Sequence, residues 1–212
     1  MIPPGGARRP LVRVTRRKFG ELDADVNASE WADAPALQLR DNVTGELPQQ
    51  ATTARLGWNE NELRILFHAI DDHPWATLTE RDGPLWEEEV VEVFLDPVGD
   101  GECYFEFEVN PLNTQLDLVL RRNRSGYRKD FRWSCAGFRS RTRRTADSWT
   151  AELAIPFQTL SAESISAGRR WRGNFHRIDR PRNAPRELSS WSPTFSGTFH
   201  APAQFGTIEF VD

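Results

Sequence analysis

Two segments of alternating residues, 86–96 and 104–110, constrain the fold of this chain more than any other part of it. The side chains of one parity are Val91, Val93, Leu95, Phe105, Phe107 and Val109. The side chains of the other parity are Trp86, Glu88, Val90, Glu92, Phe94, Tyr104, Glu106, Glu108 and Asn110. Because successive side chains of a strand point to opposite faces, two such strands would share one apolar core face. A sheet does not need the other, acidic and aromatic face in order to fold, so this face predicts a surface that holds a ligand.

The rest of the chain supplies further short segments that are typical of an all-β fold. Strands are expected at residues 11–15, 51–56, 62–70, 116–120, 131–138, 139–145, 149–155, 171–178 and 205–211, and short helical turns near 29–32 and 156–160. Roughly ten strands separated by turn signals predict a β-sandwich of the jelly-roll or immunoglobulin-like kind. Since no repeat or internal linker is present, residues 1–18 are expected to form a basic N-terminal arm and residues 19–212 a single domain.

Composition and charge exclude several classes of function. Of the 212 residues, 38% are hydrophobic and 27% are charged, as in an ordinary globular protein and unlike a disordered one. The net charge of -4 gives no global case for nucleic-acid binding. No run of about 18 apolar residues predicts a membrane-spanning helix. The first six residues lack the apolar region of a signal peptide, which fits a cytoplasmic chain or a mature secreted form.

Catalytic motifs are absent from the sequence, and the chain is therefore predicted not to be an enzyme. It contains no Ser-His-Asp constellation, no Cys-His pair, no P-loop and no dinucleotide glycine pattern. The histidines have no metal-ligand spacing; they are His68, His73, His176 and His200. Glu92 and Glu108 could be neighbours on paired strands, as a glycosidase requires, but the same pair serves ligand binding or a metal equally well.

Three smaller features leave alternatives open. Cys103 and Cys135 are either two buried thiols, the interpretation we favour, or one disulfide. An acidic turn is either a solvated hairpin or a set of oxygen ligands for calcium, and its residues are Asp96, Asp100 and Glu102. The arginines at positions 139, 141 and 143 alternate along one strand, which favours an ordinary charged sheet face over a contact with an anionic polymer.

Several motifs, taken in their order along the chain, resemble the family 9 carbohydrate-binding modules and their DOMON-like relatives. The matching segments are residues 22–32, 86–96, 107–110, 149–157, 174–179, 190–193 and 205–206. The most specific of them are the strand with Trp86 and its acidic residues and the later Ser190-Trp191-Ser192-Pro193. The resemblance covers about residues 20–212.

The resemblance implies a non-catalytic β-sandwich that binds a mono- or oligosaccharide, often a chain end, between two facing tryptophans. Trp86 and Trp191 occupy the tryptophan positions, while Glu92 and Asn110 occupy the positions that bind sugar hydroxyls. These residue types suit a sugar, whose ring faces are weakly apolar and whose edges carry hydroxyls that bind well to charged groups. Asn174 shares the parity of His176 on a later strand, which would extend the polar face.

The resemblance also implies structural calcium ions, without assigning their ligands, and a role in bacterial polysaccharide catabolism. Some related sandwiches bind b-type haem through methionine. Because Met1 is the only methionine, that ligation is excluded here, whereas bis-histidine ligation stays open.

One position departs from the family pattern. Family members carry an arginine two residues before the asparagine, where this chain has Glu108. Replacing a donor with an acceptor motivates a second hypothesis, a structural or interaction module that has lost the sugar site and forms a homodimer. Under it, Trp86 and Trp191 are core tryptophans that do not face each other. The glutamates would then lie on a solvated face, or beside a bound cation or arginine.

Overall fold

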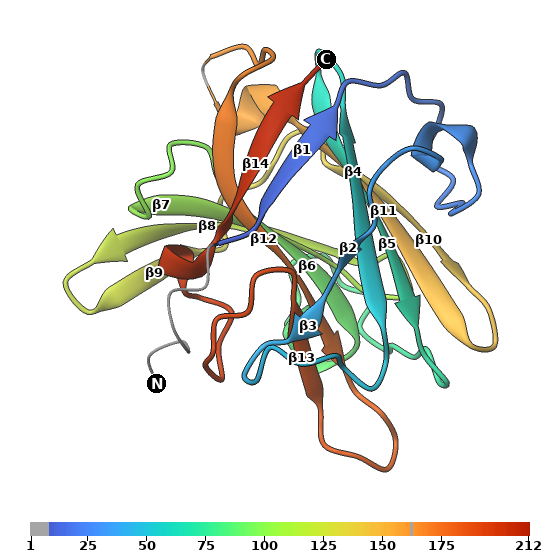
Figure 1. Ribbon diagram of the computed structural model, residues 1–212. Helices are drawn as coiled ribbons and strands as arrows, with labels where there is room; N and C mark the ends of the chain where they lie inside the picture. The colour runs from blue at the N-terminus through green and yellow to red at the C-terminus, as the bar shows by residue number, and fades with distance from the viewer. Residues whose placement is uncertain (1–8, 162) are drawn as a thin grey trace.

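Two β-sheets packed face to face make up the computed structural model, which describes residues 9–161 and 163–212 (Figure 1). The first sheet contains β1 (Leu11–Thr15), β14 (Gly206–Val211), β12 (Arg170–Asp179), β6 (Val90–Asp96), β7 (Cys103–Val109), β8 (Gln115–Asn123) and β9 (Gly126–Asp130), in that order. It also contains β13 (Glu187–Ser190), which pairs with β12, and β3 (Arg40–Asp41), which pairs with β13. The second sheet contains β10 (Arg139–Arg144), β11 (Ser148–Pro156), β5 (Glu62–Ile70), β4 (Thr52–Trp58) and β2 (Leu37–Gln38), in that order. The predicted all-β sandwich is therefore confirmed.

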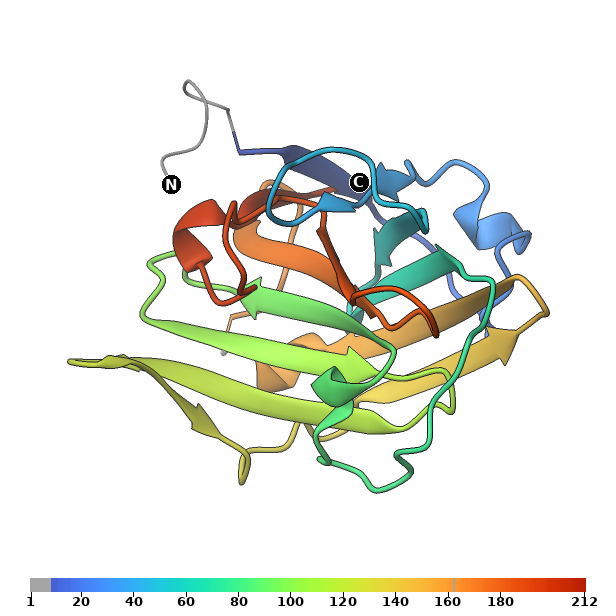
Figure 2. The same ribbon diagram turned by 90° about the horizontal axis from the view of Figure 1, so that it is seen from below.

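The strand pairs are antiparallel except for β1 with β14. Short 3-10 turns connect some of them: η1 (Ser29–Trp31), η2 (Leu85–Glu87), η3 (Phe157–Thr159) and η4 (Pro202–Gln204). In the part of the chain that is described, none of the helices is long and apolar enough to cross a bilayer. The β8–β9 hairpin extends beyond the rest of its sheet in both ribbon views (Figure 2).

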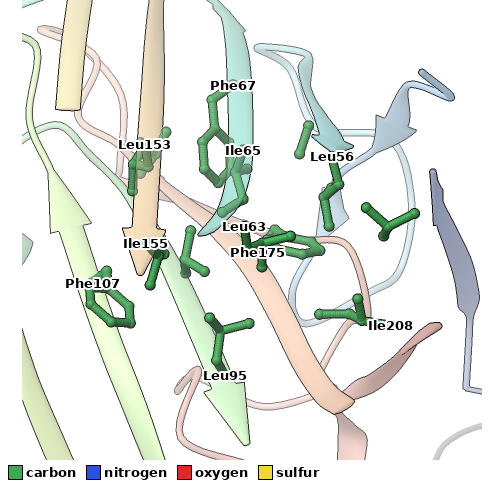
Figure 3. Close-up of a cluster of buried hydrophobic side chains, with 14 of the residues drawn as sticks. Leu56, Leu63, Ile65, Phe67, Leu95, Phe107, Leu153, Ile155, Phe175 and Ile208 are labelled. Atoms are coloured by element: carbon green, nitrogen blue, oxygen red, sulfur yellow. The ribbon is translucent and has the colours of Figure 1, made fainter. Parts of the chain in front are cut away.

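The core lies between the two sheets, where the predicted apolar parity meets the apolar face of β5 and β11 (Figure 3). Val91, Val93 and Phe107 are fully buried there. Phe67 of the opposite sheet contacts Phe175 edge-on, with ring centroids 6.4 Å apart, within the range of about 4.5–7 Å that is typical of aromatic pairs. The predicted core positions of three tryptophans are also confirmed, since each is 1% exposed; they are Trp31, Trp149 and Trp171.

The secondary structure differs from the prediction where strands are very short or where apolar residues lie in a loop. Residues 131–138 are not a strand, although Trp133 packs on Phe105 with ring centroids 4.9 Å apart. Their apolar side chains cover the sheet from a loop, which alternation alone cannot distinguish from a strand. Four strands were not expected, namely β2, β3, β9 and β13. With two to five residues each, they are too short or too polar to give a clear alternation.

The N-terminal segment is partly built into the sheet. Residues 11–15, within the expected arm, form β1 and place Val12 and Val14 in the core, so this part of the arm belongs to the domain. Residues 1–8 of the expected arm lie outside the described residues. Cys103 and Cys135 are free thiols, as favoured from the sequence; Cys135 is buried as expected, whereas Cys103 is only half-buried.

Candidate functional site

The acidic parity of β6 and β7 lies on the outer face of the first sheet, opposite the core. Across the ladder, Glu92 is paired with Glu108 on one side and with His176 of β12 on the other. Phe94 is paired with Glu106 in the next row. The partition of side chains between the two faces is therefore as the alternation predicts.

This outer face is covered, which corrects the expectation of an open polar surface. The segment 191–205 lays Phe199 over the His176 ring, with centroids 4.1 Å apart, and His200 over Phe94, with centroids 5.3 Å apart. As a result, Glu92 is 3% exposed and Glu108 is fully buried. The reason is that the same parity also carries large apolar residues that need cover. These form a second cluster with Leu85, Val90, Phe94, Tyr104, Leu116, Leu118, Leu120, Ile178, Phe199 and Phe205.

A cavity of about 380 Å³ remains between this cover and the sheet, and we call it the outer-face cavity. It is lined by Trp86, Glu92, Glu106, Lys129, Ile178, Arg186, Leu188, Gly197, Thr198, Phe199 and His200. Its size and its mixture of aromatic walls with a few polar groups are those of a small-molecule site. Four larger hollows, of about 580, 550, 470 and 410 Å³, lie among loops elsewhere, and two of them share only Arg186 with the outer-face cavity.

Three carboxyl groups converge at the floor of the outer-face cavity. Oxygens of Glu92, Glu106 and Glu108 lie within 4.8 Å of one another. Burial raises the pKa of all three carboxyls, and the charge of Glu106 raises the pKa of Glu92 further. The charges of Glu92 and Glu106 also raise the pKa of Glu108 beyond the effect of burial.

Lys129 of β9 is the cation nearest to these carboxyls. Its Nζ lies 3.6 Å from Glu106 Oε1 and 5.3 Å from the centroid of the Trp86 ring. Phe131 packs against the same indole, with centroids 6.2 Å apart. Trp86 is thus half-buried, held beside the carboxyls by a cation–π contact and an aromatic neighbour.

The histidines of the site are neutral. Burial lowers the pKa of His200 to about 3, so its Nδ1, 4.0 Å from Glu106 Oε2, does not make an ion pair at neutral pH. The same nitrogen lies 2.9 Å from the Tyr104 hydroxyl, in a hydrogen bond that fixes the ring. Burial also lowers the pKa of His176 well below its usual range, and its Nδ1 is bonded to Ser190 Oγ at 2.6 Å. Both rings therefore act as flat packing surfaces.

Trp191 lies on the other side of the sheet from Trp86, so the expectation that the two rings face each other is wrong. Trp191 belongs to the core between the sheets and packs on Phe175, with ring centroids 5.5 Å apart. A Cβ at Gly206 would collide with its indole, which shows how closely the ring lies on that strand. The physical reason is alternation after β13: Ser190 points to the outer face, and the next side chain points inward.

The two asparagines expected to bind a sugar are fully engaged with backbone. Asn110 donates to Leu78 O at 2.8 Å and accepts from the N–H groups of Leu112 and Thr114 at 3.0 and 2.9 Å. Asn174 donates to Ser192 O at 2.7 Å and accepts from Ser192 N at 2.9 Å. Both are fully buried, and they position the loops that flank the outer face.

A second group of three carboxyls lies apart from the outer-face cavity; it consists of Asp71, Glu89 and Asp179. The guanidinium of Arg177 supplies its cation, with Nη2 2.8 Å from Asp71, 3.4 Å from Glu89 and 3.4 Å from Asp179. Burial raises the pKa of Glu89 to about 9. This group serves as an internal ion-pair network.

Calcium remains a prediction for this chain. In the acidic turn, Asp96 accepts hydrogen bonds from the backbone of Gly99 and Gly101 at 2.7 and 2.9 Å, so its carboxylate caps the β6–β7 hairpin. Either group of three buried carboxyls has the spacing to hold a cation, and each already contacts a basic side chain.

The arginines of β10 form ion pairs with neighbouring acids. Arg139 pairs with Glu62 at 2.6 Å and Arg143 pairs with Asp25 at 3.2 Å, as in an ordinary charged sheet face.

Sequence reasoning missed much of the cavity wall. Glu106 belongs to the acidic parity, but parity does not show which carboxyl lines a cavity, so the sequence did not identify it as a site residue. Lys129 lies in β9, a strand that the sequence does not predict. Phe199 and His200 lie in an irregular segment with no periodic signal to place them.

Comparisons with known proteins agree with this architecture. The model of the carbohydrate family 9 binding domain-like family matches residues 22–212. No curated protein sequence matches the chain. Among solved structures, a carbohydrate binding module family 9 from Caldicellulosiruptor kristjanssonii in complex with cellotriose is similar at a TM-score of 0.72 and 17% identity, over 95% of this chain and 93% of that one.

Two further structures are similar over almost their whole length. A Bacteroides uniformis protein to which carbohydrate binding is ascribed has a TM-score of 0.78 and 20% identity, over 95% of this chain and 99% of that one. The Caldicellulosiruptor module in complex with glucose has a TM-score of 0.72 and 17% identity, over 94% and 95%. At these identities the likeness shows the shared fold.

Proposed function

Because the chain belongs to the carbohydrate family 9 binding domain-like family, we propose that it binds a mono- or oligosaccharide in the outer-face cavity, without catalysis. The observation that carries the proposal is the position of Trp86 beside the carboxyls of Glu92 and Glu106 in one cavity. An aromatic face next to buried acceptors suits a ring that has apolar C–H faces and hydroxyl donors at its edge.

The roles of the residues differ from those expected from the family. Trp86 is the stacking ring, Glu92 and Glu106 accept sugar hydroxyls, and Lys129 donates to a sugar oxygen. Glu108 lies behind them and does not line the cavity. Trp191 contributes through the core, and Asn110 and Asn174 contribute by holding loops in place.

The experiment is a calorimetric titration with glucose and cello-oligosaccharides, chosen because structurally similar proteins are known in complex with glucose and cellotriose. Trp86→Ala should weaken binding by about 1–3 kcal/mol, the value of the lost apolar contact, while the far-UV circular dichroism stays unchanged. Trp191→Phe is the matched control, and it should lower stability but leave the sugar affinity within about twofold.

Equal loss of affinity in Trp86→Ala and Trp191→Phe would contradict this assignment, because it would restore a role for both rings. Incubation of oligosaccharides with the protein should release no new reducing ends; any release would overturn the non-catalytic part of the proposal.

The second candidate is a structural or interaction module that has lost the sugar site. Glu108 favours it, because a buried carboxyl stands where family members carry a donor and has no hydrogen-bond partner among the described residues. Under this hypothesis, calorimetry on the folded protein should detect no binding of any sugar, and light scattering should show a homodimer. Sugar binding that depends on Trp86 would exclude it.

A further inference from the structure

The floor of the outer-face cavity holds more buried carboxyls than nearby cations. Glu106 is 1% exposed, and its Oε2 has no hydrogen-bond partner among residues 9–161 and 163–212. Both carboxylate oxygens of Glu108, which is fully buried, likewise have no partner among the described residues, and Glu92, 3% exposed, lines the cavity beside them. Buried acceptors without donors are costly, so this floor favours a ligand that brings donors.

The basic groups that line the cavity are too few to pair with all the carboxyls at its floor. Lys129 contacts Glu106 at 3.6 Å, while Arg186 is exposed at the rim. The His200 ring is neutral, as described above. Of the two carboxyls that line the cavity, Glu106 has the ion pair with Lys129, and Glu92 has none with the residues that the structure describes.

The side chain of Lys129 also shows what kind of group suits this place. Its ammonium lies between a carboxylate and an indole face, at 3.6 Å from Glu106 Oε1 and 5.3 Å from the Trp86 centroid. Carboxylates and aromatic faces are the two surroundings that attract an ammonium group most strongly in proteins. A second ammonium, brought by a ligand, would find the same combination beside Glu92.

Building on the proposed function, we propose that the outer-face cavity selects sugars that carry a protonated amino group. Such a group has three N–H donors and a positive charge, whereas a hydroxyl at the same ring position has one neutral donor. A neutral sugar satisfies fewer of the unpartnered oxygens, and a uronic acid brings a further carboxylate to an already acidic floor. The order of affinity is amino sugar, then neutral sugar, then acidic sugar.

Binding of the amino sugar is coupled to proton release. The groups that face Glu92 are Glu106, Glu108, Lys129, His176, His200 and, at the rim, Arg186. Because burial and Glu106 raise the pKa of Glu92, an arriving ammonium displaces a proton from this cluster. The calorimetric heat of binding should then depend on the ionisation enthalpy of the buffer for the amino sugar and not for the neutral one.

The test is calorimetry with glucosamine, glucose and glucuronate at about pH 6.5, where a sugar amine is ionised. Glucosamine should bind about tenfold more tightly than glucose, the ratio expected for one charge-assisted hydrogen bond. Glu92→Gln keeps the shape of the side chain and should remove this preference, because it should lower the affinity for glucosamine about tenfold more than the affinity for glucose. Glu209→Gln, the same change on β14 at a residue that does not line the cavity, is the matched control and should bind the sugars as the wild type does.

Each outcome separates the inference from the function on which it rests. Glucose binding equal to or tighter than glucosamine binding overturns the selectivity and leaves the sugar site standing. Binding of none of the three sugars overturns the proposed function as well. Calcium chloride, titrated separately, should give no heat that Glu92→Gln abolishes; such heat would assign the carboxyls to a metal and overturn the inference.

Discussion

The two faces of β6 and β7 are made by the same strands and are almost equally buried, yet they differ in chemistry. On the inner face, Val91, Val93 and Phe107 meet the second sheet with no exposed area. On the outer face, Glu92 and Glu108 are covered by an irregular segment and lie beside a cavity of about 380 Å³. One face is filled by apolar side chains, and the other buries acceptors without supplying all their donors.

The difference teaches that burial alone does not identify a core. A face that exists only for stability would carry apolar residues, because a buried carboxyl without a partner destabilises the folded state. The outer face retains three buried carboxyls, and oxygens of Glu106 and Glu108 have no hydrogen-bond partner among the described residues. Its residues are therefore better explained by a ligand than by folding, and this explanation can be tested by comparing substitutions on the two faces.

The largest effect is expected on the inner face. Phe107→Ala should lower the free energy of unfolding by about 3–5 kcal/mol, because it removes a fully buried ring that packs on Phe138 and Trp133. Chemical denaturation measures this change. Val98→Ala, at a position that is 76% exposed, is the control and should change stability by less than about 0.5 kcal/mol. A small effect of Phe107→Ala would show that the inner face is not the main core.

A smaller effect of opposite sign is expected on the outer face. Glu108→Met replaces an unpartnered buried carboxyl with an apolar side chain of similar length, and should raise the free energy of unfolding by about 1–3 kcal/mol. The same denaturation experiment measures it. If Glu108→Met is instead as destabilising as Phe107→Ala, the carboxyl has a structural partner, and the contrast between the faces fails.

The smallest effect is a difference in pH dependence. Burial raises the pKa of Glu108 above its unfolded value of about 4.3, so its proton binds the folded chain more tightly. The resulting stabilisation is fully present below that unfolded pKa and is lost as the pH rises through the folded pKa. Wild-type stability should therefore fall with rising pH above about 4.3, by at most about 1.4 kcal/mol per unit for this group.

Glu108→Gln removes the titrating group and should flatten this part of the profile, measured by denaturation at a series of pH values. Glu209→Gln is again a suitable control, because the arginines around Glu209 lower its pKa and give it the opposite slope. Identical slopes for wild type and Glu108→Gln would mean that Glu108 titrates in the folded protein as it does in the unfolded one.

The sequence was sufficient to predict the sandwich and to assign the side chains of β6 and β7 to two faces, because strand alternation is a local property. It also placed Trp86 and Glu92 on the outer face together. It could not reveal that this face is covered, since the cover comes from Phe199 and His200, about a hundred residues later in an irregular segment. The family pattern predicted the wrong face for Trp191. Successive side chains after β13 alternate between the two faces, so a shift of one residue decides on which face the ring lies.

The β9 strand has a consequence for how such a protein can change. It supplies Lys129 to the outer-face cavity, yet it is paired on one side only, with β8, at the end of the sheet order. Substitutions in this edge strand alter the wall of the cavity while the inter-sheet core stays intact. Ligand preference and folding are thus encoded in separable parts of the chain, so natural variation or laboratory selection can retune one with little penalty to the other.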